Sequence, residues 1–169
     1  MDKTINFISA AALFKLCEQQ HCKISEIMRK REAFLTDTNL EQIELRMRKA
    51  LSIMQHSAHQ PLKEPVISVG GLIGGEAARL RAKFREGTSI CGAVLSKAIT
   101  YSMAVLEVNA SMGLIVAAPT AGSSGVIPGV LLALQEEFSL SDDQLMDGLF
   151  TASAIGYLIM RNASVSGAQ

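Results

Sequence analysis

The chain has 169 residues, of which 49% are hydrophobic and only 5% are aromatic, and it contains no tryptophan. Its 16 basic and 16 acidic residues cancel, so no net field attracts the chain to nucleic acid or to an anionic membrane surface. No apolar run reaches the roughly 18 residues that a membrane-spanning helix needs. Three cysteines, an odd number, indicate free thiols in a reducing compartment and predict a cytoplasmic protein.

Apolar residues recur at helical spacing along most of the chain. This pattern predicts an all-α fold, a compact multi-helix domain with glycine-rich loops between its helices. The expected helices cover residues 4–20, 23–35, 38–58, 76–84, 89–112, 127–138 and 142–162.

Local signals mark the ends of some of these helices. Thr38 and Glu41 have the spacing of a capping box, which predicts that the third helix begins there. Pro61 and Pro65 predict a loop after that helix, in which no helix persists. Residues 66–69 resemble a brief strand, although no second strand candidate exists to pair with it.

The most informative segment is the loop of small residues at 118–129 (APTAGSSGVIPG), which leads into an apolar helix. Glycines let backbone N–H groups approach a ligand closely, and a helix N-terminus presents unpaired donors with partial positive charge. We expect this loop to bind a small carboxylate, and the residues expected to contact it are Thr120, Gly122, Ser123, Ser124 and Gly125. The loop lacks the signatures of phosphate-binding and dinucleotide-binding loops. The alternative is a tight connection whose hydroxyls only cap the next helix.

Other candidate groups carry weaker signals. Residues 70–75 (GGLIGG) are either a second anion nest or a turn between packed helices, and we favour the turn. Lys97 is better explained as a surface lysine than as a general base, and the sequence identifies no base. His56 and His59 are expected to be a solvated pair near a helix end.

The cysteines are expected to have packing roles, so we predict no metal ligands in the chain. Cys17 and Cys22 lie about 140° apart around a helix at about 100° per residue, and no second pair of ligands accompanies them. Cys91 lies at the start of a long apolar helix, where a small buried thiol is expected.

Three blocks of the sequence together resemble a known family. They are residues 107–113 (EVNASMG), 118–129 (APTAGSSGVIPG) and 162–168 (NASVSGA), and weaker matches lie at 25–28 (SEIM) and 72–77 (LIGGEA). In order and spacing they are similar to the α chain of bacterial iron–sulfur-dependent L-serine dehydratase, also called L-serine ammonia-lyase.

The resemblance implies a lyase of amino-acid catabolism that converts L-serine to pyruvate and ammonia. It implies a [4Fe-4S] cluster held by three cysteine thiolates, no pyridoxal phosphate, and a separate smaller β chain as partner. The fourth iron of the cluster, which no cysteine binds, would act as a Lewis acid on the leaving hydroxyl.

The chain departs from the family where it ends. In the family the third block continues into a segment bearing the first cluster cysteine, whereas this chain stops at Gln169. We therefore expect residues 1–169 to be a single helical domain, the amino-terminal portion of a longer catalytic α chain, and to be inactive alone. Asn162, Ser164 and Ser166 are expected near the cluster or substrate, or else simply at a helix end.

The last expected helix is apolar nearly all round, which predicts a buried helix and a chain that self-associates when that helix is left uncovered. Two other functions stay open. The chain is either a helical interaction module without catalysis, or part of a related iron–sulfur hydro-lyase acting on another small hydroxy acid.

Overall fold

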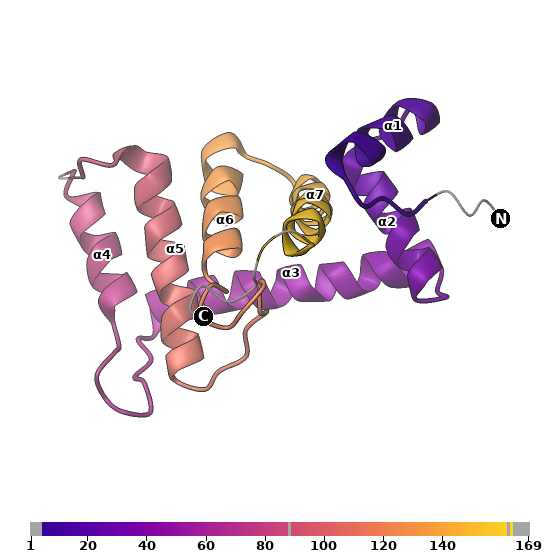
Figure 1. Cartoon of the computed structure of the whole chain (residues 1–169). Helices are drawn as coiled ribbons and strands as arrows, with labels where there is room; N and C mark the ends of the chain where they lie inside the picture. The colour runs from indigo at the N-terminus through magenta and orange to yellow at the C-terminus, as the bar shows by residue number, and fades with distance from the viewer. Residues whose placement is uncertain (1–4, 88, 162, 164–169) are drawn as a thin grey trace. The chain divides into compact units, whose positions relative to one another are not determined.

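The computed structural model describes residues 5–87, 89–161 and 163, and over these residues the chain is all-α, as predicted. It divides into two compact units: Met1–Lys49 with Asp142–Gln169, and Ala50–Ser141 (Figure 1). None of the helices in the described ranges has the length and hydropathy to cross a membrane.

The first unit contains α1 (Ala10–Gln20), α2 (Ile24–Leu35), the beginning of α3 (Leu40–Lys63) and α7 (Asp142–Met160). In this unit α2 packs against α1 and against α7. The predicted start of α1 at residue 4 is wrong, because Ser9 is extended and caps the helix by accepting a hydrogen bond from the Ala12 N–H at 3.2 Å.

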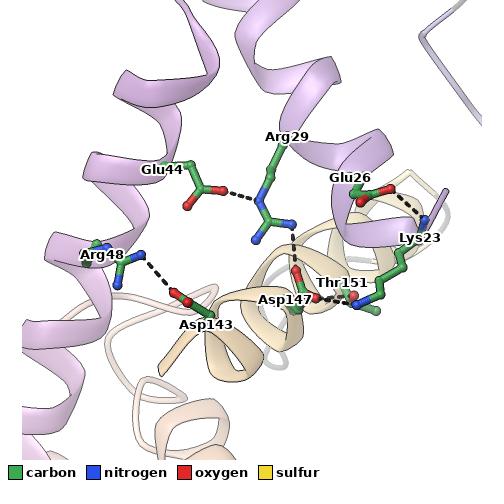
Figure 2. Close-up of polar contacts among 8 residues, drawn as sticks. All are labelled: Lys23, Glu26, Arg29, Glu44, Arg48, Asp143, Asp147 and Thr151. Atoms are coloured by element: carbon green, nitrogen blue, oxygen red, sulfur yellow. Dashed lines mark hydrogen bonds and ion pairs between the residues drawn. The ribbon is translucent and has the colours of Figure 1, made fainter. Parts of the chain in front are cut away.

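Charged side chains connect three helices of this unit (Figure 2). The Arg29 guanidinium of α2 lies 2.7 Å from a Glu44 oxygen of α3 and 2.8 Å from an Asp147 oxygen of α7. Lys23 pairs with the same aspartate at 3.0 Å, and Arg29 also covers the face of the Phe150 ring. Although burial pushes the pKa of Asp147 upward, hydrogen bonds from Arg29 and Lys23 outweigh it and hold that pKa below its ordinary value.

The helix α3 corrects two expectations from the sequence. Its cap is Asn39, whose side-chain oxygen accepts from the Gln42 N–H at 2.8 Å, whereas the Thr38 hydroxyl pairs with Thr36. The helix also continues through Pro61 to Lys63. Proline has a helix-compatible φ and costs one backbone hydrogen bond, and the burial of its ring offsets part of that cost.

The second unit contains the rest of α3 together with α4 (Glu76–Arg85), α5 (Gly92–Ala110) and α6 (Val126–Phe138). In Figure 1 α5 runs beside both α4 and α6, and it packs against both. Small side chains fill the contacts, and the buried set includes Ala98, Ala104, Val105, Leu132 and Ala133. Small residues allow the helices to approach closely, which fixes where the loop between α5 and α6 begins and ends.

The segment between α3 and α4 forms a turn with a single isolated bridge between Ile67 and Gly74 instead of the brief strand expected at 66–69. The Ser68 N–H donates to the Ile73 carbonyl at 2.8 Å, and the Gly71 N–H donates back to Ser68 at 2.9 Å. The favoured interpretation of residues 70–75 as a turn is confirmed by these bonds.

The helix α7 is buried on one side only, over Leu145, Met146, Leu149, Phe150 and Ala154. Ile155, Ile159 and Met160 at its end are about half exposed, at 48%, 56% and 55%. The expectation that this helix is buried is therefore confirmed for one face only.

Candidate substrate-binding site

The candidate site is the loop between α5 and α6, where the second unit brings three segments of its chain together. Residues 118–125 form the loop itself, which contains a cis peptide bond between Ala118 and Pro119. The end of α5 and the turn at 66–75 contact one another through a hydrogen bond from the Val69 N–H to the Ala110 carbonyl, at 3.2 Å. Asn109 then ties α5 to the loop, because its side-chain amide donates to the Ala121 carbonyl at 3.3 Å.

The hydroxyls of Thr120 and Ser123 form the polar centre of this loop. Their oxygens lie 3.0 Å apart, and the Ser123 hydroxyl also lies 3.1 Å from the Ala118 carbonyl. The Ser123 N–H points to the Thr120 hydroxyl at 3.3 Å. Thr120 is exposed and Ser123 half-buried, so a solute at the surface can replace one of these internal partners.

The two residues that follow lie inside the protein. Ser124 is fully buried, and its hydroxyl donates to the Ala121 carbonyl at 2.7 Å. Gly125 is buried as well, and its φ of −79° lies in the ordinary helical region. Any residue can adopt this φ, so the backbone conformation does not explain why position 125 is a glycine.

Helix packing explains why position 125 is a glycine. A Cβ placed there would lie 2.5 Å from the carbonyl oxygen of Ser102 on α5, far inside van der Waals contact. At Gly129, one turn further along α6, a Cβ would collide with the Ser102 side chain. Gly122 differs from both, because its nearest neighbour, the Thr120 hydroxyl oxygen, would lie 4.0 Å from a Cβ. Of the five predicted contact residues, Thr120, Gly122 and Ser123 are accessible to a ligand. Ser124 and Gly125 are buried beneath the loop and pack within the protein.

The helix α6 begins at Val126, directly after the loop. The Val126 N–H donates to the Ser123 carbonyl, and the Gly129 N–H closes the first turn on Gly125 at 2.9 Å. Pro128 lies in this first turn, where its missing N–H costs least. The hydroxyl pair thus lies just before a helix N-terminus, an arrangement that favours a small anion.

Four further candidates from the sequence are not part of this loop. Asn162, Ser164 and Ser166 lie outside the described residues. Lys97 pairs with Glu137 at 3.0 Å and with Glu136 at 3.6 Å. The hydrogen bond to Glu137 is the main cause of its raised pKa, which keeps the amine charged and unsuited to accept a proton.

The histidines differ from the expected solvated pair. His56 is exposed, but His59 is half-buried, with its ring 5.0 Å from the ring of Tyr101 and its Nδ1 2.7 Å from the Gln55 carbonyl. The helix α3 extends beyond both residues, so they lie further from its end than the sequence indicated.

The described residues contain no group of three or more His, Cys, Asp or Glu side chains placed to hold a metal ion. Cys17 and Cys22 are half-buried in the first unit, and burial followed by the neighbouring Cys22 raises the pKa of Cys17. Cys91 is exposed, so the expected burial of that thiol is wrong. It lies at the very start of α5, ahead of the part of the helix that packs.

Sequence reasoning named the block 107–113 but gave Glu107 no role. This side chain is only 1% exposed, and its Oε1 accepts from the Ala77 N–H of α4 at 2.7 Å. A glutamate within an otherwise apolar stretch of helix is a signal for such a buried acceptor. Its partner could not be identified from the sequence, because Ala77 lies 30 residues away.

The chain is similar to known proteins over most of its length. Residues 19–169 match the family described as serine dehydratase alpha chain. The chain is 39% identical over 162 residues to a probable L-serine dehydratase, alpha chain, of Bacillus subtilis (strain 168), an alignment that covers 96% of this chain and 54% of that relative. It is 33% identical to the L-serine dehydratase, alpha chain, of Peptoniphilus asaccharolyticus, over 95% of this chain and 55% of the relative.

A relative that is not named as an alpha chain is slightly less similar. The chain is 32% identical to L-serine dehydratase 2 of Escherichia coli (strain K12), over 96% of this chain and 36% of that relative. The chain thus spans about half the length of the two alpha chains and about a third of this longer relative. Because the family match covers all of α2 to α7, the chain belongs to the serine dehydratase alpha chain family.

Proposed function

We propose that this chain is part of an L-serine dehydratase, which converts L-serine to pyruvate and ammonia. In this reaction the α proton and the β hydroxyl leave serine as water, and 2-aminoacrylate remains. Its imine tautomer takes up water and releases ammonia, which gives pyruvate. Membership of the family and two relatives named as alpha chains support this assignment.

The part that we assign to the described residues is recognition of the substrate carboxylate. The observation that carries it is the hydroxyl pair of Thr120 and Ser123, which lies at the surface directly before the N-terminus of α6. On binding, the two hydroxyls would turn from each other and donate to the carboxylate oxygens, while Gly122 leaves the backbone bare beside them. Hydrogen bonds to a charged acceptor are stronger than the neutral bonds that they replace.

The proposal includes a [4Fe-4S] cluster, a separate β chain and a cytoplasmic location, and it excludes pyridoxal phosphate. The described cysteines do not fit a cluster, because no three ligands converge among them. Any cluster therefore takes its ligands from elsewhere, and we assign no step to it. Asn162, Ser164 and Ser166 remain candidates for contact with cluster or substrate.

A ligand titration followed by NMR tests the carboxylate site. We expect L-serine to shift the amide signals of Thr120, Gly122 and Ser123, and to leave the amide of Leu132 in the core of α6 unchanged. Glycerate, which has the carboxylate and a β hydroxyl but no amino group, serves as the second ligand. D-serine serves as a third ligand. Tighter binding of L-serine than of D-serine and of glycerate supports a serine enzyme.

The other outcomes distinguish the alternatives. Glycerate binding as tightly as L-serine would favour a hydro-lyase that acts on another hydroxy acid. An unchanged loop with every ligand would favour an interaction module and contradict the carboxylate site. Pyruvate formation from L-serine by an enzyme assembled with this chain tests the activity itself.

A further inference from the structure

Glu107, in the last turn of α5, supplies a cap for a different helix. Gly75 lies at the N-cap of α4 and has no side chain to satisfy the first N–H groups of that helix. The Glu107 carboxyl group satisfies one of them instead, because its Oε1 accepts from the Ala77 N–H at 2.7 Å. This bond gives a partner to only one of the two carboxyl oxygens of Glu107.

The second oxygen, Oε2, is buried and has no hydrogen-bond donor among the described residues. The neighbouring Glu76 carboxyl interacts with Glu107 and contributes to the raised pKa of Glu107. Glu76 is well supplied with donors, since its Oε2 accepts from the Gly74 N–H at 2.6 Å and its Oε1 pairs with Arg79 at 2.7 Å. Two carboxyl groups in contact do not both ionise, because one charge strongly disfavours the other.

Burial and charge decide which of the two carries the proton. Glu76 is partly exposed and pairs with a guanidinium, whereas Glu107 is 1% exposed and forms no ion pair within the described part of the chain. Burial is the largest cause that raises the pKa of Glu107, and the Glu76 charge adds to it. The pKa of Glu76 is lowered chiefly by its own backbone N–H. Burial opposes this, and the Gly74 N–H and Arg79 add to the lowering.

We propose that Glu107 holds a proton at neutral pH and donates it to the Glu76 carboxylate, so that a carboxyl–carboxylate pair joins the end of α5 to the start of α4. The proton makes a donor of the oxygen that otherwise has none, and Oε1 stays an acceptor for α4. The protonated acid leaves neither oxygen without a hydrogen-bond partner and buries no charge, whereas the carboxylate would do both.

The pair also positions the candidate site. Within four residues, the end of α5 contacts α4 through Glu107, the loop 118–125 through Asn109 and the turn at 66–75 through Ala110. Glu107 is therefore a positioning residue, since movement of this turn of α5 would move the loop as well. The link to substrate rests on the proposed function, whereas the shared proton does not.

Infrared spectroscopy of this chain and its Glu107→Gln variant tests the proton. A protonated carboxylic acid has a C=O stretch well separated from the carboxylate bands. We expect this band at neutral pH in the unsubstituted chain and in the exposed control Glu41→Gln, and we expect its loss in Glu107→Gln. The absence of the band from the unsubstituted chain would overturn the proposal.

Stability against pH gives a second, independent measurement. The native state holds this proton more tightly than the unfolded state, so its contribution is full below the ordinary glutamate pKa of 4.5 and is lost as pH rises through the raised value. The neutral amide in Glu107→Gln should remove this decline and leave a folded chain. A variant that fails to fold at neutral pH would instead show that Glu107 is needed as an anion.

Two other variants test the partner and the positioning role. In Glu76→Gln the acid band should titrate at lower pH, and an unchanged midpoint would exclude Glu76 as the partner. In Glu107→Ala, amide exchange should accelerate at Ala77 and also at residues 120–123 of the loop, and Glu107→Gln should restore both rates. Faster exchange at Ala77 alone would reduce Glu107 to a simple cap and contradict the positioning role.

Discussion

Gly125 and Ser102 lie so close that a Cβ on the glycine would be 2.5 Å from the serine carbonyl oxygen. Ser102 belongs to the middle of α5, and Gly125 is the last residue before α6. The same serine faces Gly129 one turn later, so the first turn of α6 rests directly on the α5 backbone. The loop that carries Thr120 and Ser123 therefore ends at a tight helix contact.

Replacing Gly125 with alanine should destabilise the protein, because the added methyl group forces the two helices apart. Overpacking of this kind costs about 1–3 kcal/mol, and contact with rigid backbone places this position toward the upper end. Thermal unfolding checks the loss. Gly122→Ala is the matched control, since a Cβ there meets nothing closer than 4.0 Å. Equal stability of the two variants would contradict the packing explanation.

Removing the hydroxyls of Thr120 and Ser123 together should raise KM for L-serine, by about ten- to hundredfold for each hydroxyl, because a hydrogen bond to a charged group is worth roughly 1.5–3 kcal/mol. The change should be mainly in KM, because the carboxylate is bound alike in the ground and transition states. Steady-state kinetics of the assembled enzyme measures it.

Ser124→Ala provides the comparison for that double variant. Its hydroxyl is buried and serves the Ala121 carbonyl, so its loss should lower the melting temperature and change KM little. Loss of the double variant's iron with an unchanged KM in the surviving enzyme would show instead that the loop supports the cluster.

Asp147→Asn should weaken the first unit in a pH-dependent way. The lowered pKa of Asp147 means that its contribution is present above the ordinary value of 3.8 and disappears as pH falls through the lower native value. We expect a loss of about 1.5–3 kcal/mol at neutral pH and a flatter acid limb. Denaturant unfolding across pH checks both, with the exposed Glu64→Gln as control. A steep acid limb in Asp147→Asn would assign the effect to another group.

Incubation of this chain with iron and sulfide under anaerobic conditions should leave no iron that resists a chelator. A cluster needs several thiolates that converge, and the described residues offer no such set. Iron analysis after chelation and the visible absorption spectrum are the measurements. Stoichiometric, chelator-resistant iron would show that Cys17, Cys22 or Cys91 is a ligand.

The end of α7 should make the isolated chain self-associate. Ile155, Ile159 and Met160 are each about half exposed, and soluble monomers seldom leave large contiguous apolar patches bare. Sedimentation and binding of a hydrophobic dye test this expectation. Substitution of Ile159 by a charged residue should reduce both, and a monomer that binds no dye would contradict it.

Much of the fold was predictable because helical periodicity is a local property. Several of the errors lie at helix ends, where neighbouring residues of similar chemistry compete. Asn39 replaces Thr38 as a cap because both side chains can accept a backbone N–H, and only the geometry selects one. Pro61 stays helical because tertiary burial outweighs a single missing hydrogen bond, which local rules do not count.

The candidate site was predictable only as a segment. Small residues and hydroxyls before a helix identified the loop, but which of them face solvent depends on the contact with α5. Ser123 and Ser124 are adjacent serines in one loop, yet one is accessible and the other is fully buried. Glu107 escaped assignment because its partners lie on a different helix.

The contact between Ser102 and Gly125 has a consequence for the thermodynamics of binding. A flexible loop loses conformational entropy when it closes on a ligand, and that loss subtracts from affinity. Here one end of the loop is already immobilised by two packed helices, and Asn109 restrains its middle through Ala121. Little conformational entropy therefore remains for the loop to lose, which would favour the proposed binding of a ligand as small as a single amino acid, which has few contacts to offer.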